Sequence, residues 1–129
     1  MSVIEKLEEK LVNYPQLEVL KKDNEITIKA KDEKGFDITL YDDSGRLTVA
    51  FGNWHNEFDT EEEAINIIGF GLSNECRLKE FKKGKTIYKW VVESLEDGKW
   101  VECFTTGLIF YPFWRKTSEE IFQNNVINS

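Results

Sequence analysis

The sequence predicts an α+β domain in which an N-terminal helix and a central helix pack on one side of a curved antiparallel sheet of meander strands. Three observations support this fold class. Two segments open with capping boxes and continue with apolar residues at helical spacing. Several others alternate apolar and polar residues, and short glycine-containing turns separate them. A chain of 129 residues has the usual length of one domain, so residues 1–129 are expected to form a single compact domain.

The N-terminal helix is predicted over residues 2–13. Ser2 and Glu5 have the spacing of a capping box, in which each side chain bonds to the backbone of the other residue. Apolar residues then recur at helical spacing, and Pro15 marks the end of the helix. These apolar residues are Ile4, Leu7 and Leu11. They give the helix one apolar face that can pack on a sheet.

Three strands are expected after this helix. Apolar residues occupy every second position in residues 26–30, 36–40 and 47–51. The connections between them contain the sequences DEKG and DDSG, which are typical of tight turns. Short connections between alternating segments indicate an antiparallel meander.

The central helix is predicted to begin after Thr60, which has the spacing of a second capping box with Glu63. Acidic residues fill its first turn, where the helix dipole favours negative charge: Glu61, Glu62 and Glu63. An apolar stripe follows at helical spacing: Ile65, Ile68 and Leu72. Gly69 and Gly71 weaken the end of the helix and are expected to let it approach the sheet closely.

The second half of the chain predicts longer and more aromatic strands. Their ranges are 76–82, 86–95 and 99–111. The second of them has apolar residues on both faces and is therefore expected to be central in the sheet. Asp97 and Gly98 predict a two-residue hairpin before the third strand. Residues 117–127 fit either a short capped helix or a last strand, and we favour the strand.

Charge and composition exclude several classes of function. Net charge is −7, from 24 acidic and 17 basic residues, and such a surface repels the phosphate backbone of nucleic acids. Most of the acidic excess lies in residues 1–64, whereas the densest basic patch lies in residues 77–85. The longest apolar run, residues 107–114, is too short to cross a bilayer, and the N-terminus has no signal-peptide pattern. We therefore expect a cytoplasmic protein with no nucleic acid or membrane partner.

The stretch GNWHNEFD, residues 52–59, contains the single histidine of the chain. If the stretch is extended, Trp54 lies on one face, and His55 and Glu57 lie on the other. His55 and Glu57 have the spacing that opens the zinc deaminase signature, but neither cysteine belongs to the P-C-x-x-C motif that completes it. No metal and no cofactor are therefore expected. Weak acid-base chemistry at His55 stays open, because a neighbouring carboxylate can orient an imidazole.

A second candidate site is the aromatic segment TTGLIFYPFWRK, residues 105–116. Its residue types are enriched in the hot spots of protein interfaces, and Pro112 would interrupt strand pairing and present the following residues on a bend. The candidates for contact are Tyr111, Phe113, Trp114 and Arg115. The alternative is a core strand whose end packs under a helix, because aromatic residues also dominate ordinary cores.

Three hypotheses of function follow. The first is a non-catalytic protein-binding module of inhibitor or immunity type, which binds a partner with a basic surface through an acidic face and the aromatic patch. Its expected binding residues are Trp54, His55, Glu57, Glu61, Glu62, Glu63, Tyr111, Phe113, Trp114 and Arg115. The second is a small-molecule-binding sheet domain with an aromatic pocket formed by Trp54, Trp90 and Trp100 together with the segment 105–116. The third is a homo-oligomer subunit. We rank the binding module first and lean against an enzyme.

Overall fold

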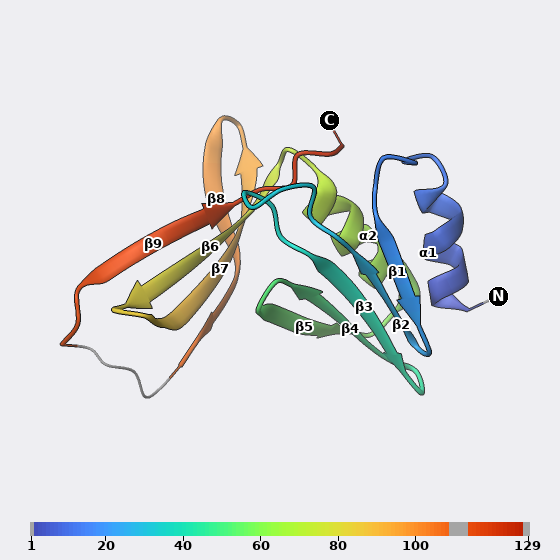
Figure 1. The fold of residues 1–129 in the computed structure, drawn as a ribbon, viewed down its shortest axis with the longest axis horizontal. Helices are drawn as coiled ribbons and strands as arrows, with labels where there is room; N and C mark the ends of the chain where they lie inside the picture. Colours follow the sequence, from blue (N-terminus) through green and yellow to red (C-terminus); the bar gives the residue numbers. More distant parts are fainter. Residues whose placement is uncertain (1, 109–113, 128–129) are drawn as a thin grey trace.

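The computed structural model describes residues 2–108 and 114–127 and places two helices and two antiparallel sheets in these parts of the chain (Figure 1). The helices are α1 (Val3–Leu11) and α2 (Glu61–Leu72). The strands of the first sheet are β1 (Val19–Lys22), β2 (Glu25–Ile28), β3 (Ile38–Asp43), β4 (Arg46–Phe51) and β5 (Trp54–Phe58). The strands of the second sheet are β6 (Cys76–Lys83), β7 (Thr86–Glu96), β8 (Lys99–Gly107) and β9 (Thr117–Phe122). The predicted α+β class, with antiparallel strands and two helices, is confirmed.

The first sheet is a meander in which each strand pairs with the next along the chain, in the order β1-β2-β3-β4-β5. The three strands expected after the first helix correspond to β2, β3 and β4, and the stretch around the histidine forms β5. Strand β1 was not predicted from the sequence. All of its residues are exposed, so they do not alternate between apolar and polar types.

One face of the first sheet forms the core. Alternate residues of β2, β4 and the first part of β3 are buried, as the period of two predicts. Both helices bury their apolar stripes in the same cluster: Val3, Ile4, Leu7 and Leu11 from α1, and Ala64, Ile68 and Leu72 from α2. The Ser2 Oγ caps α1 by accepting a hydrogen bond from the Glu5 N–H at 3.2 Å. The Thr60 Oγ1 caps α2 through the Glu63 N–H at 3.1 Å.

The second sheet has the order β8-β7-β6-β9, so β7 has a neighbour on each side, as its two apolar faces predict. Residues 117–122 form β9 and pair with β6, so the strand alternative for the tail is confirmed and the helix alternative is wrong. The sequence predicted one curved sheet, whereas the strands divide into two sheets separated in the chain by α2. In Figure 1 the second sheet extends to the left of the first, away from α1.

The two sheets meet through aromatic side chains. The ring of Trp54 on β5 lies 5.2 Å from the ring of Phe104 on β8, and the ring of Phe58 lies 6.4 Å from Phe104 in an edge-on arrangement. Buried residues of β6 and β7, among them Leu78 and Val92, belong to the same apolar cluster as the first sheet. The two sheets therefore share one core.

The segment after β9 fastens the second sheet to the first half of the chain. Asn124 is only 3% exposed. Its Oδ1 accepts a hydrogen bond from the Phe36 N–H at 2.9 Å, and its Nδ2 donates to the Gly71 carbonyl at 3.0 Å. The N–H groups of Val126 and Ile127 both donate to the Leu72 carbonyl, at the end of α2. These bonds satisfy backbone groups that the helix end would otherwise leave without partners.

Gly71 permits the close approach of α2 to the first sheet that the sequence predicted. A Cβ atom at this position would lie 2.5 Å from the Cζ of Phe51, well inside van der Waals contact. Gly69 has no such neighbour, since a Cβ atom there would meet nothing within 4 Å. Neither helix in the described parts of the chain is long and apolar enough to cross a membrane.

Candidate functional site

Trp54 lies in the core, although the sequence placed it among the expected binding residues. Strand β5 pairs Trp54 with Phe51, which places its side chain on the buried face of the sheet. The indole is 2% exposed and packs between the rings of Phe51 and Phe104, at 5.1 and 5.2 Å. Because an aromatic residue next to a polar stretch fits both a surface and a core, only the register decides its place.

The aromatic pocket expected from three tryptophans is not formed by these rings. Trp100 lies under the guanidinium of Arg77, whose Cζ is 4.2 Å from the ring centroid. Arg77 alternates along β6 with the buried residues Cys76 and Leu78, so its side chain projects from the opposite face of the second sheet. Trp54 and Trp100 therefore lie on different sides of this sheet.

His55 and Glu57 lie on the outer face of the first sheet, as predicted from the alternation, and both are exposed. The Glu57 carboxylate accepts a hydrogen bond from Arg46 Nη2 at 2.7 Å. His55 pairs across the strands with Ala50 and has no side-chain partner in the described parts of the chain. The carboxylate that could have oriented the imidazole is therefore held by Arg46 instead.

The acidic cluster of Glu61, Glu62 and Glu63 lies in the first turn of α2. Glu61 forms an ion pair with Lys6 of α1. The side chains of Glu62 and Glu63 are exposed, and the Glu63 N–H is held by the helix cap. Helix capping, the helix dipole and one ion pair thus account for much of this cluster without any partner.

Two of the four contacts predicted in the aromatic segment, Trp114 and Arg115, are exposed beside the hairpin between β6 and β7. Trp114 is 70% exposed. Trp114 and Arg115 line a hollow of about 600 Å³ together with the hairpin residues 83–86. Gly84, at the turn, has a positive φ of 63° and lies against the aliphatic part of Arg115. The other two predicted contacts, Tyr111 and Phe113, lie outside the described residues.

Basic and aromatic side chains interleave on the open face of the second sheet, which we call the cationic aromatic face. It comprises Arg77, Lys79, Phe81, Lys83, Tyr88, Lys89 and Trp100. Besides Arg77 over Trp100, the Nζ of Lys89 lies 5.2 Å from the centroid of the Phe81 ring. The density of basic residues in 77–85 is visible in the sequence, and the period of two in R-x-K-x-F-x-K was the signal that Arg77, Lys79, Phe81 and Lys83 share one face.

The acidic cluster and the exposed Trp114 lie far apart in the molecule. The acidic cluster contacts α1 through the ion pair of Lys6 with Glu61, and α1 lies at the right end of Figure 1. Trp114 lies against the hairpin between β6 and β7, which points to the left end of Figure 1. The acidic cluster and Trp114 therefore do not form one continuous surface.

The described titratable groups offer little for catalysis. Burial raises the pKa of the Cys76 thiol strongly, and burial and Glu96 raise the pKa of the Cys103 thiol, so neither is an activated thiolate. Burial also raises the pKa of the Glu80 carboxyl, although Lys82 acts in the opposite direction. Within residues 2–108 and 114–127, no group of three His, Cys, Asp or Glu side chains is arranged to hold a metal ion.

No family model, no curated protein and no solved structure matches this chain. A function can therefore be inferred only from the arrangement of its residues.

Proposed function

We propose that this chain is a non-catalytic protein-binding module that contacts an acidic partner surface through Trp114 and the cations around it. The observation that carries the proposal is the 70% exposure of Trp114 in a hollow rimmed by Arg115, Lys83 and Lys85. An exposed tryptophan leaves a large apolar surface in water, and Trp and Arg are the residue types most enriched in interface hot spots.

The charge around Trp114 favours an acidic partner. Arg115 and Lys85 have no carboxylate partner in the described parts of the chain. Lys83 Nζ donates a hydrogen bond to the Thr117 hydroxyl, which does not neutralise the positive charge of Lys83. On the cationic aromatic face, Arg77 and Lys79 are both paired with Glu93, and Lys89 adds one further cation next to this hairpin. Complementary charge at such a site speeds association and selects the partner.

The acidic cluster of Glu61, Glu62 and Glu63 gives weaker support to a partner with a basic surface. Glu61 is already paired with Lys6, and the helix start gives all three acids a structural role. A basic partner bound to Glu62 and Glu63 is therefore the second candidate. An inhibitor or immunity-type role in the cytoplasm, as the sequence suggests, fits either partner, because such proteins act by occupying a surface.

The test is affinity capture on the immobilised protein, from a nuclease-treated lysate of the organism that encodes it, at low and high salt. The expected result is one stoichiometric protein that wild type captures at low salt and releases at high salt. A Trp114→Ser, Arg115→Gln double variant is expected to lose it. The matched control, a Glu62→Gln, Glu63→Gln double variant, is expected to retain it.

Capture that depends on Glu62 and Glu63 but not on Trp114 would replace this proposal with the basic partner. A partner that disappears only when nuclease is added would indicate nucleic acid and would contradict the proposal. A partner retained by both double variants would show that neither surface is the binding site.

A further inference from the structure

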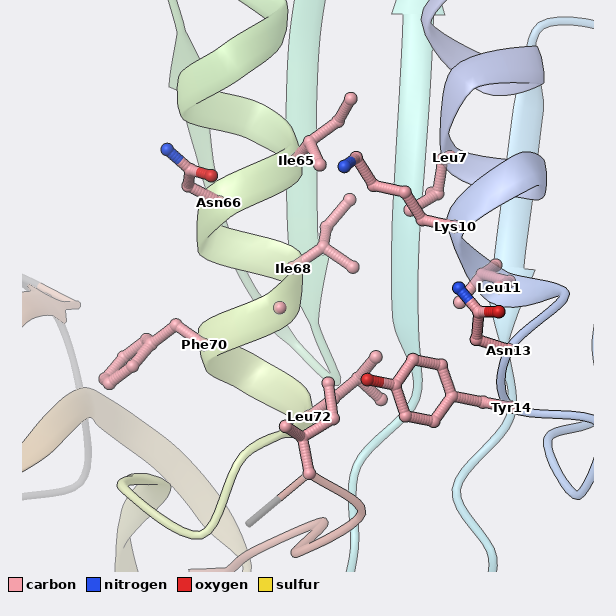
Figure 2. Close-up of a pocket in the computed structure, with 12 residues that line it drawn as sticks. Leu7, Lys10, Leu11, Asn13, Tyr14, Ile65, Asn66, Ile68, Phe70 and Leu72 are labelled. Atoms are coloured by element: carbon pink, nitrogen blue, oxygen red, sulfur yellow. The ribbon is translucent and has the colours of Figure 1, made fainter. Parts of the chain in front are cut away.

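A groove of about 370 Å³ lies between α1 and α2, on the helical side of the molecule (Figure 2). Its walls are mainly apolar and include Leu7, Leu11, Ile65, Ile68 and Leu72. This volume lies within the range of small-molecule sites, which are concave and mostly apolar with a few polar groups that orient the ligand.

Lys10 places an unpaired cation at this apolar groove. One turn earlier on α1, Lys6 forms an ion pair with Glu61 of α2. Four residues further along each helix, Lys10 faces Ile65, and Figure 2 shows the Lys10 ammonium directed across the groove towards it. No anionic partner of Lys10 exists in the described parts of the chain. The groove therefore offers apolar walls and one positive charge.

Gly69 keeps the α2 side of the groove open. It lines the groove, and a Cβ atom there would meet nothing within 4 Å. Glycine inside a helix is less stable than alanine, so a helical glycine calls for a reason. At Gly71 the reason is packing against Phe51, but no neighbour accounts for Gly69. The open space in the groove is what a side chain at Gly69 would occupy.

We propose that this groove binds a small aliphatic carboxylic acid, with its carboxylate on the Lys10 ammonium and its chain between the two helices. The chain would run past Ile68 and Gly69 towards Leu72. Tyr14 closes that end, and Figure 2 shows its hydroxyl directed towards Leu72. The site is separate from the protein-binding surface proposed at Trp114, so either can fail without the other.

The net charge of the protein does not prevent a carboxylate from binding at Lys10. Net charge is −7, which repels an anion at long range. At physiological ionic strength, however, charges beyond about 8 Å are largely screened. Of the two acids one turn before Ile65 on the facing helix, Glu61 is paired with Lys6, and Glu62 is exposed to solvent. The local interaction with Lys10 therefore decides the sign of the contact.

The test is titration calorimetry with hexanoate, octanoate and decanoate below their micelle concentrations, and with octanol as the uncharged match. Each methylene that enters the groove is expected to tighten binding about fourfold, and octanol is expected to bind more weakly than octanoate. Lys10→Met is expected to weaken octanoate binding about threefold to fivefold, as for an exposed ion pair, and to leave octanol unchanged. The control Lys99→Met removes an exposed cation on β8 and is expected to change nothing.

Gly69→Leu fills the groove from α2 and is expected to abolish binding while the protein stays folded, which its circular dichroism and thermal unfolding would verify. Binding that ignores chain length, or survives Gly69→Leu, would overturn the proposal. Equal affinities for octanoate and octanol would overturn the role of Lys10. A concentration-dependent dimer abolished by Gly69→Leu would identify a second copy of the chain as the occupant instead.

Discussion

The two sheets differ in how their faces are covered. The inner face of the first sheet lies under both helices, and its alternate residues are almost completely buried. The second sheet has fewer buried residues. Its buried apolar residues, among the described ones, are Cys76, Leu78, Val91 and Val92. The longest strand, β7, is apolar on both faces in the sequence but mostly half-buried in the structure.

Alternation of apolar and polar residues therefore indicates which residues of a strand share a face, whereas the burial of that face depends on which elements cover it. On the second sheet, long basic side chains and aromatic rings cover each other on the open face. The second sheet therefore depends on its junction with the first for much of its stability.

The largest contrast is expected between two tryptophans, one in each region. Trp54→Ala removes a ring that is 2% exposed at the junction and is expected to lower the free energy of unfolding by about 3 to 5 kcal/mol. Trp100→Ala removes a ring held mainly by Arg77 and is expected to cost about 1 kcal/mol. Urea denaturation of both variants measures this. Similar losses for the two would show that the second sheet is as tightly packed as the first.

The clamp at the C-terminal segment is expected to have the next largest effect. Asn124→Ala leaves the buried Phe36 N–H and Gly71 carbonyl without their side-chain partner. Each orphaned group costs roughly 1 to 3 kcal/mol, so a total loss of at least about 2 kcal/mol is expected. Amide hydrogen exchange should show faster exchange in β6 and β9 than in β3.

Gln123→Ala is the graded control for this clamp, because it removes one bond, from Gln123 Nε2 to the Asn74 carbonyl at 2.8 Å. A smaller loss than for Asn124→Ala is expected, about 1 kcal/mol. Uniformly faster exchange in both sheets of Asn124→Ala would mean that the two sheets unfold as one unit.

The two glycines of α2 are expected to respond in opposite directions. Gly71→Ala forces a Cβ atom to within 2.5 Å of the Phe51 ring and is expected to cost about 1 to 3 kcal/mol through overpacking. Gly69→Ala meets no neighbour and is expected to stabilise the protein by about 0.5 to 1 kcal/mol. Thermal unfolding of the pair checks both signs. Destabilisation by Gly69→Ala would contradict the open groove beside α2.

The smallest effect concerns Glu80, a carboxyl of the second sheet that is only 7% exposed. Burial raises its pKa above the ordinary value of 4.5, so the folded state holds the proton to higher pH than the unfolded chain does. The stability that protonation contributes is present below that ordinary value and is lost as pH rises through the folded pKa. Glu80→Gln is therefore expected to melt above wild type at about pH 7 and to match it below about pH 4.

Melting temperatures measured across this pH range test the prediction, with the exposed Glu102→Gln on β8 as the control. A difference between Glu80→Gln and wild type that does not change with pH would show that the carboxyl is not desolvated.

The helix starts, one hairpin and the faces of the strands could be predicted from the sequence. Capping boxes at Ser2 and Thr60 predicted both helix starts, because a cap depends only on residues within one turn. Asp97 and Gly98 predicted the hairpin between β7 and β8, and both have the positive φ that such a turn requires, 51° and 78°. The alternation also placed His55 and Glu57 on the face opposite Trp54. Of the candidate site, an exposed bend at Trp114 and Arg115 was one of two alternatives that the sequence left open, the other being a core strand.

Which faces of the helices and strands pack together depends on the tertiary structure. It divided the strands into two sheets, buried Trp54 against Phe104 and gave the Glu57 carboxylate to Arg46. It also placed Lys10 of α1 opposite Ile65 of α2, although more than fifty positions separate them in the chain. The spacing of apolar residues in one helix or strand indicates only which of its faces is buried. The pairing of faces between distant elements depends on packing that no single segment specifies.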